Sequence, residues 1–239
     1  MKTASLPARK SIAPFTEIPA GGLLSRRQLE LAQVPSPLGR RRNRLLKRAV
    51  DVGATTVFIL LLFPWFLPLA ALLICIDSRG PVFFRQRRHK RNGREFYCLK
   101  LRTMVLNRDA DTCAAFEGDR RITRVGRLLR RTHLDELPQL LNVWWGDMSL
   151  VGPRPHMLSE NERFTLDVPG YRLRQQVKPG ITGLAQVRGH VGATHDRVAI
   201  ERRVQSDVQY IRHWTLVLDA RILWGTVASF FTGSKNRRA

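Results

Sequence analysis

Two adjacent carboxylates, Asp135 and Glu136, stand in the segment RRTHLDELPQ, directly after an arginine pair and before an apolar stretch. The spacing of Thr132 and Asp135 also fits a capping box, in which acidic residues only stabilise the first turn of a helix. Pro138 argues against a helix that starts at Thr132, because a proline inside it would clash with the preceding turn. A helix that begins near Asp135 has Pro138 in its first turn, where a missing N–H costs little. The sequence therefore predicts that the acidic pair lies at the start of a helix.

A carboxylate at this position could do more than cap a helix. Arg130 and Arg131 lie close by in the sequence, and nearby cations favour the ionised form, so we expect Asp135 to stay ionised at neutral pH. An ionised carboxylate can attack phosphorus as a nucleophile or bind Mg²⁺. The arginines would let a phosphate approach, because their charge offsets the repulsion between two anions. The residues by themselves indicate a phosphate site with a poised carboxylate.

Other basic residues are candidates for the same phosphate site. Arg154 lies between two prolines in GPRP, which stiffen the backbone, so its guanidinium suits a bidentate phosphate contact; an idle surface arginine is the alternative. Lys100 and Arg102 alternate along the predicted strand YCLKLRTM and should share one face. In KPGITGLAQVRG, Gly183 indicates backbone that closely approaches a ligand or a neighbouring segment. We expect the three cations to line one pocket.

The composition indicates an anionic partner. Lys and Arg number 41 against 19 Asp and Glu, and the net charge of +22 suits nucleic acid, anionic lipid headgroups or phosphorylated substrates. The chain shows no recognition-helix motif and no aromatics interleaved on a basic strand, which argues against nucleic acid. The three cysteines lie far apart and form neither a disulfide framework nor a metal cluster, which favours a reducing cytoplasmic environment.

An uncharged run between Asp51 and Asp77 is long enough for a helix to cross a bilayer. Its length and lack of a polar face argue against a buried core helix. Arginines and lysines flank both ends, and since such residues mark the cytoplasmic side, both ends are predicted to lie there. Pro64, near the middle, can kink the helix. We therefore predict a re-entrant helix-hairpin that breaks at Pro64, with an ordinary span as the alternative.

The chain divides into parts of different composition. We assign a disordered basic arm, the re-entrant helix-hairpin, a cytoplasmic domain and a basic tail to residues 1–43, 44–78, 79–233 and 234–239. Within the domain, residues 83–84 and 96–99 are predicted strands of a hairpin about Asn92 and Gly93. Arginines at every third position from Arg121 to Arg130 predict a helix that is either solvated or interfacial.

Several motifs then follow one another in a fixed order: KRAVD, GPVFFRQRR, LKLRTM, LDELPQLLNVWWGDMSLVGPRP, KPGITGLAQVRG and DVQYI. This succession resembles the bacterial sugar transferase family, the small monotopic phosphoglycosyl transferases, over roughly residues 44 to 232. The resemblance implies transfer of a sugar-1-phosphate from a nucleotide-diphosphate sugar, commonly a UDP-hexose, to polyprenyl (undecaprenyl) phosphate. That reaction is the first membrane step of exopolysaccharide, capsule or O-antigen assembly.

The resemblance also implies roles for single residues. Asp135 would attack the β-phosphate, expel the nucleoside monophosphate and carry the phosphosugar until polyprenyl phosphate takes it. Glu136 would be the partner carboxylate, and Mg²⁺ bound by Asp135 and Glu136 is the expected cofactor. The basic phosphate-binding positions and a further acidic position at the substrate site match Lys100, Arg130, Arg154 and Asp207.

The fold class that we expect is mixed α/β and mostly helical: the re-entrant helix-hairpin, a small cytoplasmic catalytic domain and interfacial amphipathic helices. The resemblance implies the bacterial inner (cytoplasmic) membrane, with both ends and the catalytic domain on the cytoplasmic face, next to anionic lipid. It leaves open which sugar and pathway are served and whether a homodimer forms.

Departures from the family pattern concern the kink and the substrate pocket. Phe63 precedes Pro64 where some members have serine, Lys178 replaces a frequent arginine, and Leu184 stands where tryptophan is common. We expect no nucleic-acid partner. Two alternatives of another class stay open: a membrane-tethered nucleic-acid binder, supported only by charge, and a scaffold for an envelope assembly.

Overall fold

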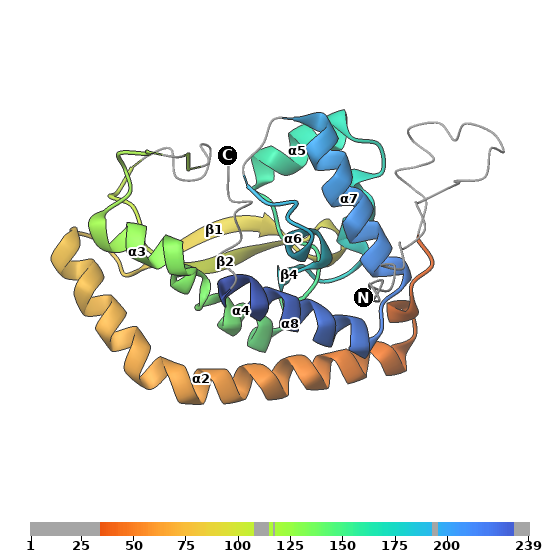
Figure 1. Cartoon of the computed structure of the whole chain (residues 1–239), viewed down its shortest axis with the longest axis horizontal. Coiled ribbons are helices and arrows are strands. Elements are labelled where there is room, and N and C mark those ends of the chain that lie inside the picture. Colours follow the sequence, from red (N-terminus) through yellow and green to blue (C-terminus); the bar gives the residue numbers. More distant parts are fainter. Residues whose placement is uncertain (1–33, 108–114, 117, 193–195, 232–239) are drawn as a thin grey trace, which may run out of the picture.

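The computed structural model describes residues 34–107, 115–116, 118–192 and 196–231, and it shows the predicted mixed, mostly helical α/β fold (Figure 1). The α-helices and strands are α2 (Arg41–Asp77), β1 (Phe83–His89), β2 (Glu95–Leu101), α3 (Arg124–Thr132), α4 (Gln139–Trp145), β3 (Ser149–Val151), α5 (Leu158–Asp167), β4 (Gly180–Thr182), α6 (Leu184–Val187), α7 (Arg197–Arg212) and α8 (Leu216–Phe231). Short 3₁₀ helices connect them: η1 (Pro37–Gly39), η2 (Arg91–Gly93), η3 (Leu134–Glu136) and η4 (Tyr171–Gln176).

The first sheet is the predicted hairpin. β1 and β2 pair antiparallel, with His89 opposite Glu95 next to the turn. Asn92 and Gly93 turn the chain with φ angles of 62° and 69°, in the left-handed region that Asn and Gly adopt most readily. The hairpin prediction is confirmed, and both strands extend further than the aromatic residues that revealed them.

The second sheet pairs β3 and β4 in parallel at the centre of the domain. All three residues of β3 are buried. Directly after β4, a Cβ on Gly183 would lie 2.3 Å from the carbonyl oxygen of Gly152, so only glycine lets these two segments approach. The prediction that Gly183 marks a close backbone approach is confirmed, and the neighbour is the loop that follows β3.

Large apolar side chains from α4, α5, α7 and α8 pack around β3 and form one core. The most deeply buried members include Val143, Val151, Phe164, Tyr171, Ile200, Ile211 and Ile222. Each such side chain contributes roughly 1.5–3 kcal/mol by leaving water. This core holds the loops after α3 and β3 against each other, and these loops carry the residues that the sequence singles out.

The apolar run forms one continuous helix, α2, with Pro64 and Pro68 inside it. The helix bends along its length and wraps around one side of the domain, below α4 and α8 in the view of Figure 1. Of the described residues, α2 alone is long and apolar enough to cross a membrane, and 17% of its most apolar window is buried. The sequence predicted that the helix breaks into two at Pro64. The structure shows one bent helix instead, because a helix can kink at proline and continue.

Polar contacts attach the first half of α2 to the domain. Lys47 forms a buried ion pair of 2.6 Å with Asp219 of α8. Asp51 accepts hydrogen bonds from the Ser149 hydroxyl and the Leu150 N–H of β3, each at 3.1 Å. Moving this part of α2 away from the core would break these contacts and separate buried charges. The contacts therefore hold the first half of α2 against the domain.

The other end of α2 is attached to the same domain. The carboxylate of Asp77 accepts a hydrogen bond of 2.8 Å from the N–H of Val125, in the first turn of α3. Arg102 donates to the carbonyl oxygens of Ser78, at 2.6 Å, and of Arg79. Between the two attachments, the middle of α2 exposes large apolar side chains such as Leu60, Leu61 and Trp65.

The predicted N-terminal arm is partly structured. Residues 1–33 of the arm and all of the predicted tail 234–239 lie outside the described residues. Residues 34–43 are ordered, however, with Val34 and Leu38 buried in the core and α2 beginning at Arg41. The Ser36 hydroxyl donates to the carbonyl of Ile211 at 2.7 Å. Two isolated apolar residues make no detectable period, which is why the sequence did not reveal this docking.

Candidate active site

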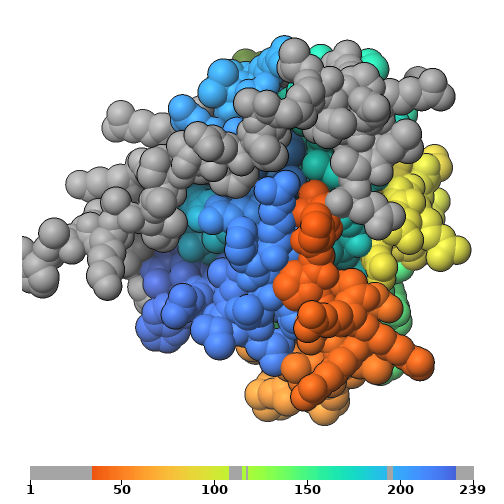
Figure 2. Space-filling view, turned by 90° about the vertical axis from the view of Figure 1, so that its right-hand side faces the viewer, coloured from red at the N-terminus to blue at the C-terminus, as the bar shows by residue number. Residues whose placement is uncertain are grey.

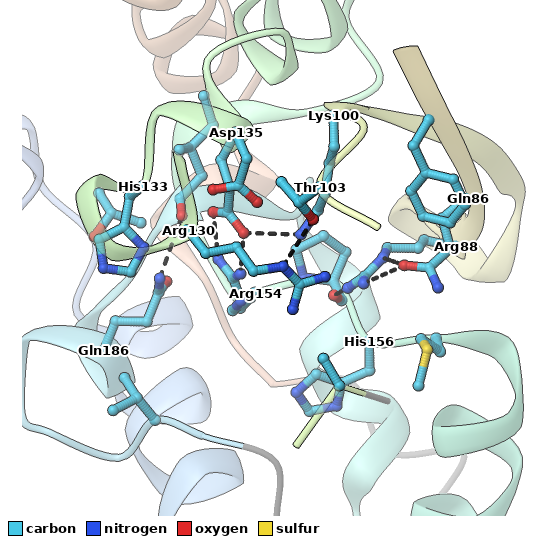
Figure 3. Close-up of a pocket in the computed structure, with 18 of the residues that line it drawn as sticks. Gln86, Arg88, Lys100, Thr103, Arg130, His133, Asp135, Arg154, His156 and Gln186 are labelled. Carbon is cyan, nitrogen blue, oxygen red and sulfur yellow. Dashed lines mark hydrogen bonds and ion pairs between the residues drawn. The ribbon is translucent and has the colours of Figure 1, made fainter. Parts of the chain in front are cut away.

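A cavity of about 950 Å³ opens between the β1–β2 hairpin, η3, α6 and the loop after β3. Its polar wall brings together six predicted site residues: Lys100, Arg102, Arg130, Asp135, Glu136 and Arg154. Figure 3 labels Lys100, Arg130, Asp135 and Arg154 among them. Other walls are apolar and include Leu106, Val187, Val191 and Leu223. The cavity thus combines a charged end with an apolar remainder.

The acidic pair lies in η3, between two helices. His133 ends α3 in the left-handed conformation, with φ of 57°, and starts the 3₁₀ turn that contains Asp135. Pro138 follows as the N-cap of α4, which needs no N–H from it. The predicted helix start near Asp135 is confirmed in part, because the turn there is 3₁₀ and the α-helix begins only at Gln139.

Glu136 accepts hydrogen bonds from two cations. Lys100 Nζ donates to its Oε1 at 2.8 Å, and Arg154 donates to both of its oxygens, with 3.0 Å from Nη1 to Oε2. Burial alone would raise its pKa, but the charges and hydrogen bonds of Arg154 and Lys100 hold the pKa of Glu136 well below its usual range. Glu136 therefore stays ionised and fixes both cations beside Asp135.

Asp135 lacks the hydrogen bonds that hold Glu136. It is 7% exposed and accepts no hydrogen bond from the residues that the structure describes. Burial raises its pKa to about 6, and the charge of Glu136 adds to this, while Lys100 and the nearby arginines lower the pKa by less. The cations were predicted to lower the pKa of Asp135. This direction is wrong, because burial raises the pKa by more than the cations lower it. With a pKa near 6, the carboxylate is still mostly ionised at neutral pH.

Arg130 reaches the cavity from α3. Its Nε donates to the Thr103 hydroxyl at 2.7 Å (Figure 3). The approach of α3 depends on Gly126, where a Cβ would lie 2.0 Å from the carbonyl oxygen of Thr103. Thr123 caps this helix by accepting a hydrogen bond from the N–H of Gly126. Helix capping and a missing side chain together position Arg130 next to Asp135.

Asn142 positions β2 against α4, and the sequence reasoning missed it. Its side-chain oxygen accepts from the N–H of Leu99 at 2.9 Å, and its Nδ2 donates to the carbonyl of Tyr97 at 2.8 Å. This buried amide thus bonds the strand edge beside Lys100, which brings Lys100 to Glu136 of η3. A single asparagine in an apolar helix gives no signal in the sequence that would predict this role.

Arg102 was predicted to bind phosphate beside Lys100. It lines the cavity, but its hydrogen bonds go to backbone carbonyls at the end of α2. β2 ends at Leu101, so the alternation of strand faces no longer applies to Arg102. Its buried guanidinium turns to the C-terminal end of α2 and donates to carbonyls there, including Ser78 and Arg79. The hydrogen bonds of Arg102 therefore cap the C-terminal end of α2.

Arg102→Ala should therefore lower the free energy of unfolding by about 2–3 kcal/mol, because it removes charge-assisted hydrogen bonds from helix-end carbonyls. Arg124→Ala, which removes an exposed arginine at the start of α3, is the control and should change stability by less than about 0.5 kcal/mol. Chemical unfolding in detergent measures both. Equal stability of the two variants would contradict the capping role.

Asp207 was predicted to lie at the substrate site, and the structure instead buries it behind the loop after β3. It forms an ion pair of 2.8 Å with Arg174, and both side chains are 5% exposed or less. Arg174 also donates to the carbonyl oxygen of Arg154 at 2.7 Å. Asp207 therefore acts on the site through Arg174, which holds the backbone of the GPRP loop.

A buried polar network completes this support, and the sequence reasoning missed it. Arg174 donates to His156 Nδ1 at 2.8 Å and to the Tyr171 hydroxyl at 3.0 Å, and that hydroxyl donates to Asn161 at 2.7 Å. Burial, followed by the charge of Arg174, holds the pKa of His156 well below its usual range, so it remains neutral. The spacing of these residues carries no metal or catalytic signature that would have revealed them.

The carboxylates suit a magnesium ion only when a phosphate of the substrate is bound beside them. Among the described residues, no group of three or more His, Cys, Asp or Glu side chains is placed to hold a metal. Mg²⁺ is usually bound by one or two carboxylates plus substrate phosphates. Both oxygens of Glu136 already bind cations, whereas Asp135 accepts no hydrogen bond from described residues. Of the two predicted metal ligands, Asp135 and Glu136, it is therefore Asp135 that could hold Mg²⁺ together with substrate phosphates.

Comparison with known proteins decides which class of protein this cavity belongs to. The family model for the bacterial sugar transferases matches residues 42–233, from the start of α2 to the end of α8. The chain belongs to the bacterial sugar transferase family. This confirms the resemblance seen in the motifs, and the match includes every residue of the charged end of the cavity.

Relatives of this bacterial sugar transferase have named activities. The UDP-glucose:undecaprenyl-phosphate glucose-1-phosphate transferase of Caulobacter vibrioides is 46% identical over 206 residues, which cover 86% of this chain and 77% of that protein. The Escherichia coli protein of the same name is 46% identical over 198 residues, but these are 42% of its length. The exopolysaccharide production protein PSS of Rhizobium leguminosarum is 42% identical over 200 residues, or 98% of its length. The chain thus spans less than half of one relative and nearly all of another.

Proposed function

We propose that this sugar transferase moves a sugar-1-phosphate from a UDP-sugar, and specifically a UDP-hexose, to undecaprenyl phosphate during polysaccharide assembly. The names of its relatives support both substrates. The observation that carries the proposal is Asp135, a buried carboxylate that accepts no hydrogen bond from the described residues and lies among cations in a large cavity. Neither the nucleic-acid binder nor the scaffold is favoured by any feature of this site.

The chemistry proceeds in two displacements at one phosphorus atom. An oxygen of Asp135 attacks the phosphorus that carries the sugar, and the bond from that phosphorus to UMP breaks, so UMP leaves with the electron pair. An oxygen of undecaprenyl phosphate then attacks the same phosphorus of the phosphosugar–Asp135 adduct. The bond to Asp135 breaks, which regenerates the carboxylate and yields an undecaprenyl diphosphate sugar.

The surrounding residues stabilise these steps electrostatically. Lys100 and Arg154 are held in place by Glu136, so they can receive the charge on the phosphoryl oxygens without rearranging. Arg130 is positioned next to Asp135 by its hydrogen bond to Thr103. The apolar walls suit the polyprenyl chain. When bound at Asp135 and the phosphates, Mg²⁺ would add further charge neutralisation.

The pKa of Asp135 predicts the pH dependence of turnover. If the ionised carboxylate is the nucleophile, kcat/KM should rise about tenfold per pH unit below pH 6 and level off above pH 7, because Glu136 ionises at much lower pH. Initial rates of UMP release between pH 4.5 and about 8 provide the measurement. A midpoint near pH 4, the value of an exposed carboxyl, would contradict the buried nucleophile.

The bent helix α2 supports the re-entrant topology. Its first half is bonded to α8 and β3, and its last residues are bonded to α3 and Arg102 of the same domain. An ordinary span would separate the two ends by the thickness of the membrane and break one set of these contacts. We therefore propose that α2 dips into one leaflet of the inner membrane, with both ends and the catalytic domain on the cytoplasmic face, where the flanking basic residues favour them.

Cysteine accessibility distinguishes the topologies. In a cysteine-free background, Arg41→Cys before the apolar run and Arg94→Cys in the hairpin lie at exposed positions. Both should resist a membrane-impermeant thiol reagent in intact cells and react after lysis. Reaction of one position in intact cells and protection of the other would show an ordinary span.

A panel of UDP-sugars tests the proposed activity directly. Membranes that contain the protein, supplied with undecaprenyl phosphate, should release UMP with at least one UDP-hexose and not with UDP alone. The same membranes without the protein are the control. Failure to turn over any UDP-sugar would contradict the proposal.

A further inference from the structure

A cationic notch lies outside the cavity, where α2, the end of α4 and the tip of the β1–β2 hairpin meet. It consists of four cations and two tryptophans: Arg48, Lys90, Arg91, Lys178, Trp144 and Trp145. None of them lines the cavity that holds Asp135. Figure 2 shows the start of α2 in orange and the hairpin in yellow on one face of the molecule.

Gly146 brings two of these cations together. A Cβ at this glycine would lie 3.3 Å from Lys178 Nζ and 3.5 Å from Arg48 Nη2, so both charges surround the same small space. Arg48 is held there by donating to the carbonyls of Val143 and Trp144, at the C-terminal end of α4. Because Gly146 has no side chain, neither cation is displaced from its place beside this glycine.

The positive charge of the notch is not balanced. Lys90 is paired with Asp147 at 2.6 Å. Lys178 forms no hydrogen bond or ion pair with any residue that the structure describes, and the buried Nε of Arg91 has no partner there either. Burial and then the charge of Arg48 lower the pKa of Lys178, although the carboxylates of Asp51 and Asp147 oppose this. An anion in the notch would relieve the repulsion and accept the free hydrogen bonds.

The position of the notch indicates the kind of anion. Arg48 lies one helical turn before the uncharged run of α2, and at 1.5 Å per residue this is the level of lipid headgroups when the run is in the bilayer. Trp144 and Trp145 are 47% and 58% exposed, and tryptophan is enriched at this level of membranes.

We propose that the cationic notch binds the phosphate of an anionic phospholipid headgroup, with Lys178 and Arg48 as its principal contacts. This inference rests on the membrane topology proposed above. The bound lipid would fix the corner between α2 and α4 at the membrane surface, outside the cavity that holds the reacting carboxylate.

Lipid retention tests the inference. The full chain is placed in nanodiscs of equal parts phosphatidylcholine and phosphatidylglycerol, and native mass spectrometry measures which lipid stays bound on release. Wild type should retain phosphatidylglycerol in preference, and Lys178→Gln should lower that retention about fivefold, as expected for removing one cation at an anionic surface. Lys178→Arg should keep it. Arg91→Gln is a second loss variant, should Lys178→Gln fold poorly.

Arg202→Gln, an exposed arginine of α7 outside the notch, is the matched control and should retain lipid as wild type does. Equal retention of both lipids by wild type, or no loss in either notch variant, would overturn the inference. Displacement of the lipid by glycerol 3-phosphate would also overturn it, since the notch would then bind soluble phosphate. UMP release on the same samples separates the proposals: retention without turnover contradicts only the enzymatic function, and turnover without selective retention contradicts only the lipid site.

Discussion

Replacing Asp135 with asparagine should abolish UMP release from a UDP-hexose, lowering kcat/KM by at least about 10⁴-fold. Asparagine keeps the size of the side chain but lacks the anionic oxygen that must bond to phosphorus. The assay is UMP release by membranes that contain each variant. Arg124→Ala should leave turnover unchanged, because this exposed residue does not line the cavity. Retained turnover in the asparagine variant would refute Asp135 as the nucleophile.

The same substitution should make the protein more stable. The pKa of Asp135 is raised from 3.8 to about 6 in the folded state, so folding favours the protonated form and the ionised carboxylate costs stability above pH 6. Asparagine removes this cost, and the free energy of unfolding at pH 7.5 should rise by about 1–3 kcal/mol. Below about pH 4 the gain should vanish, because Asp135 is then protonated in both states. A destabilised variant at pH 7.5 would contradict the burial effect.

Asp207→Asn should lower the free energy of unfolding by about 3–5 kcal/mol, because it leaves the buried guanidinium of Arg174 without its counter-charge. The loss should also reach the active site. Arg174 holds the carbonyl of Arg154, so a shifted loop would weaken the pairing of Arg154 with Glu136. Chemical unfolding measures the first effect, and the KM for the UDP-sugar measures the second.

Glu201→Gln is the matched control for this prediction. Glu201 pairs with Arg197 on the exposed face of α7, and an exposed pair of this kind contributes at most about 0.5 kcal/mol. The double variant Asp207→Asn with Arg174→Met should recover part of the stability, because no unpaired charge remains. If Asp207→Asn is as stable as Glu201→Gln, the ion pair does not support the loop.

Local patterns in the sequence revealed the features that depend on neighbouring residues. The Asn92–Gly93 turn determines its own hairpin, since few other residues adopt two successive positive φ angles. Pro138 located the acidic pair near the start of a helix for an equally local reason. Such inferences need no knowledge of the rest of the fold.

Features that depend on distant partners were not predictable. Arg102 continues the strand pattern in sequence, but β2 ends one residue earlier and the guanidinium turns to α2 instead. The partner of Asp207 lies 33 residues away in η4, and no spacing rule connects residues of two helices at that separation. The pKa of Asp135 depends on burial, which the sequence around it does not show.

The apolar segment was predictable in part. Its length and uncharged character predicted a membrane-associated helix, and α2 has both properties. Whether proline bends or breaks a helix depends on what packs on either side, and here contacts at both ends hold one bent helix against the domain.

The central claim is that Asp135 carries the phosphosugar, and intact-protein mass spectrometry tests it most directly. The full chain is mixed with a UDP-hexose without undecaprenyl phosphate, quenched and weighed, and its peptides are then sequenced. We predict a mass increase of one hexose phosphate, located on Asp135, that disappears when undecaprenyl phosphate is added. UMP released without any adduct, or an adduct on another residue, would contradict the two-step mechanism.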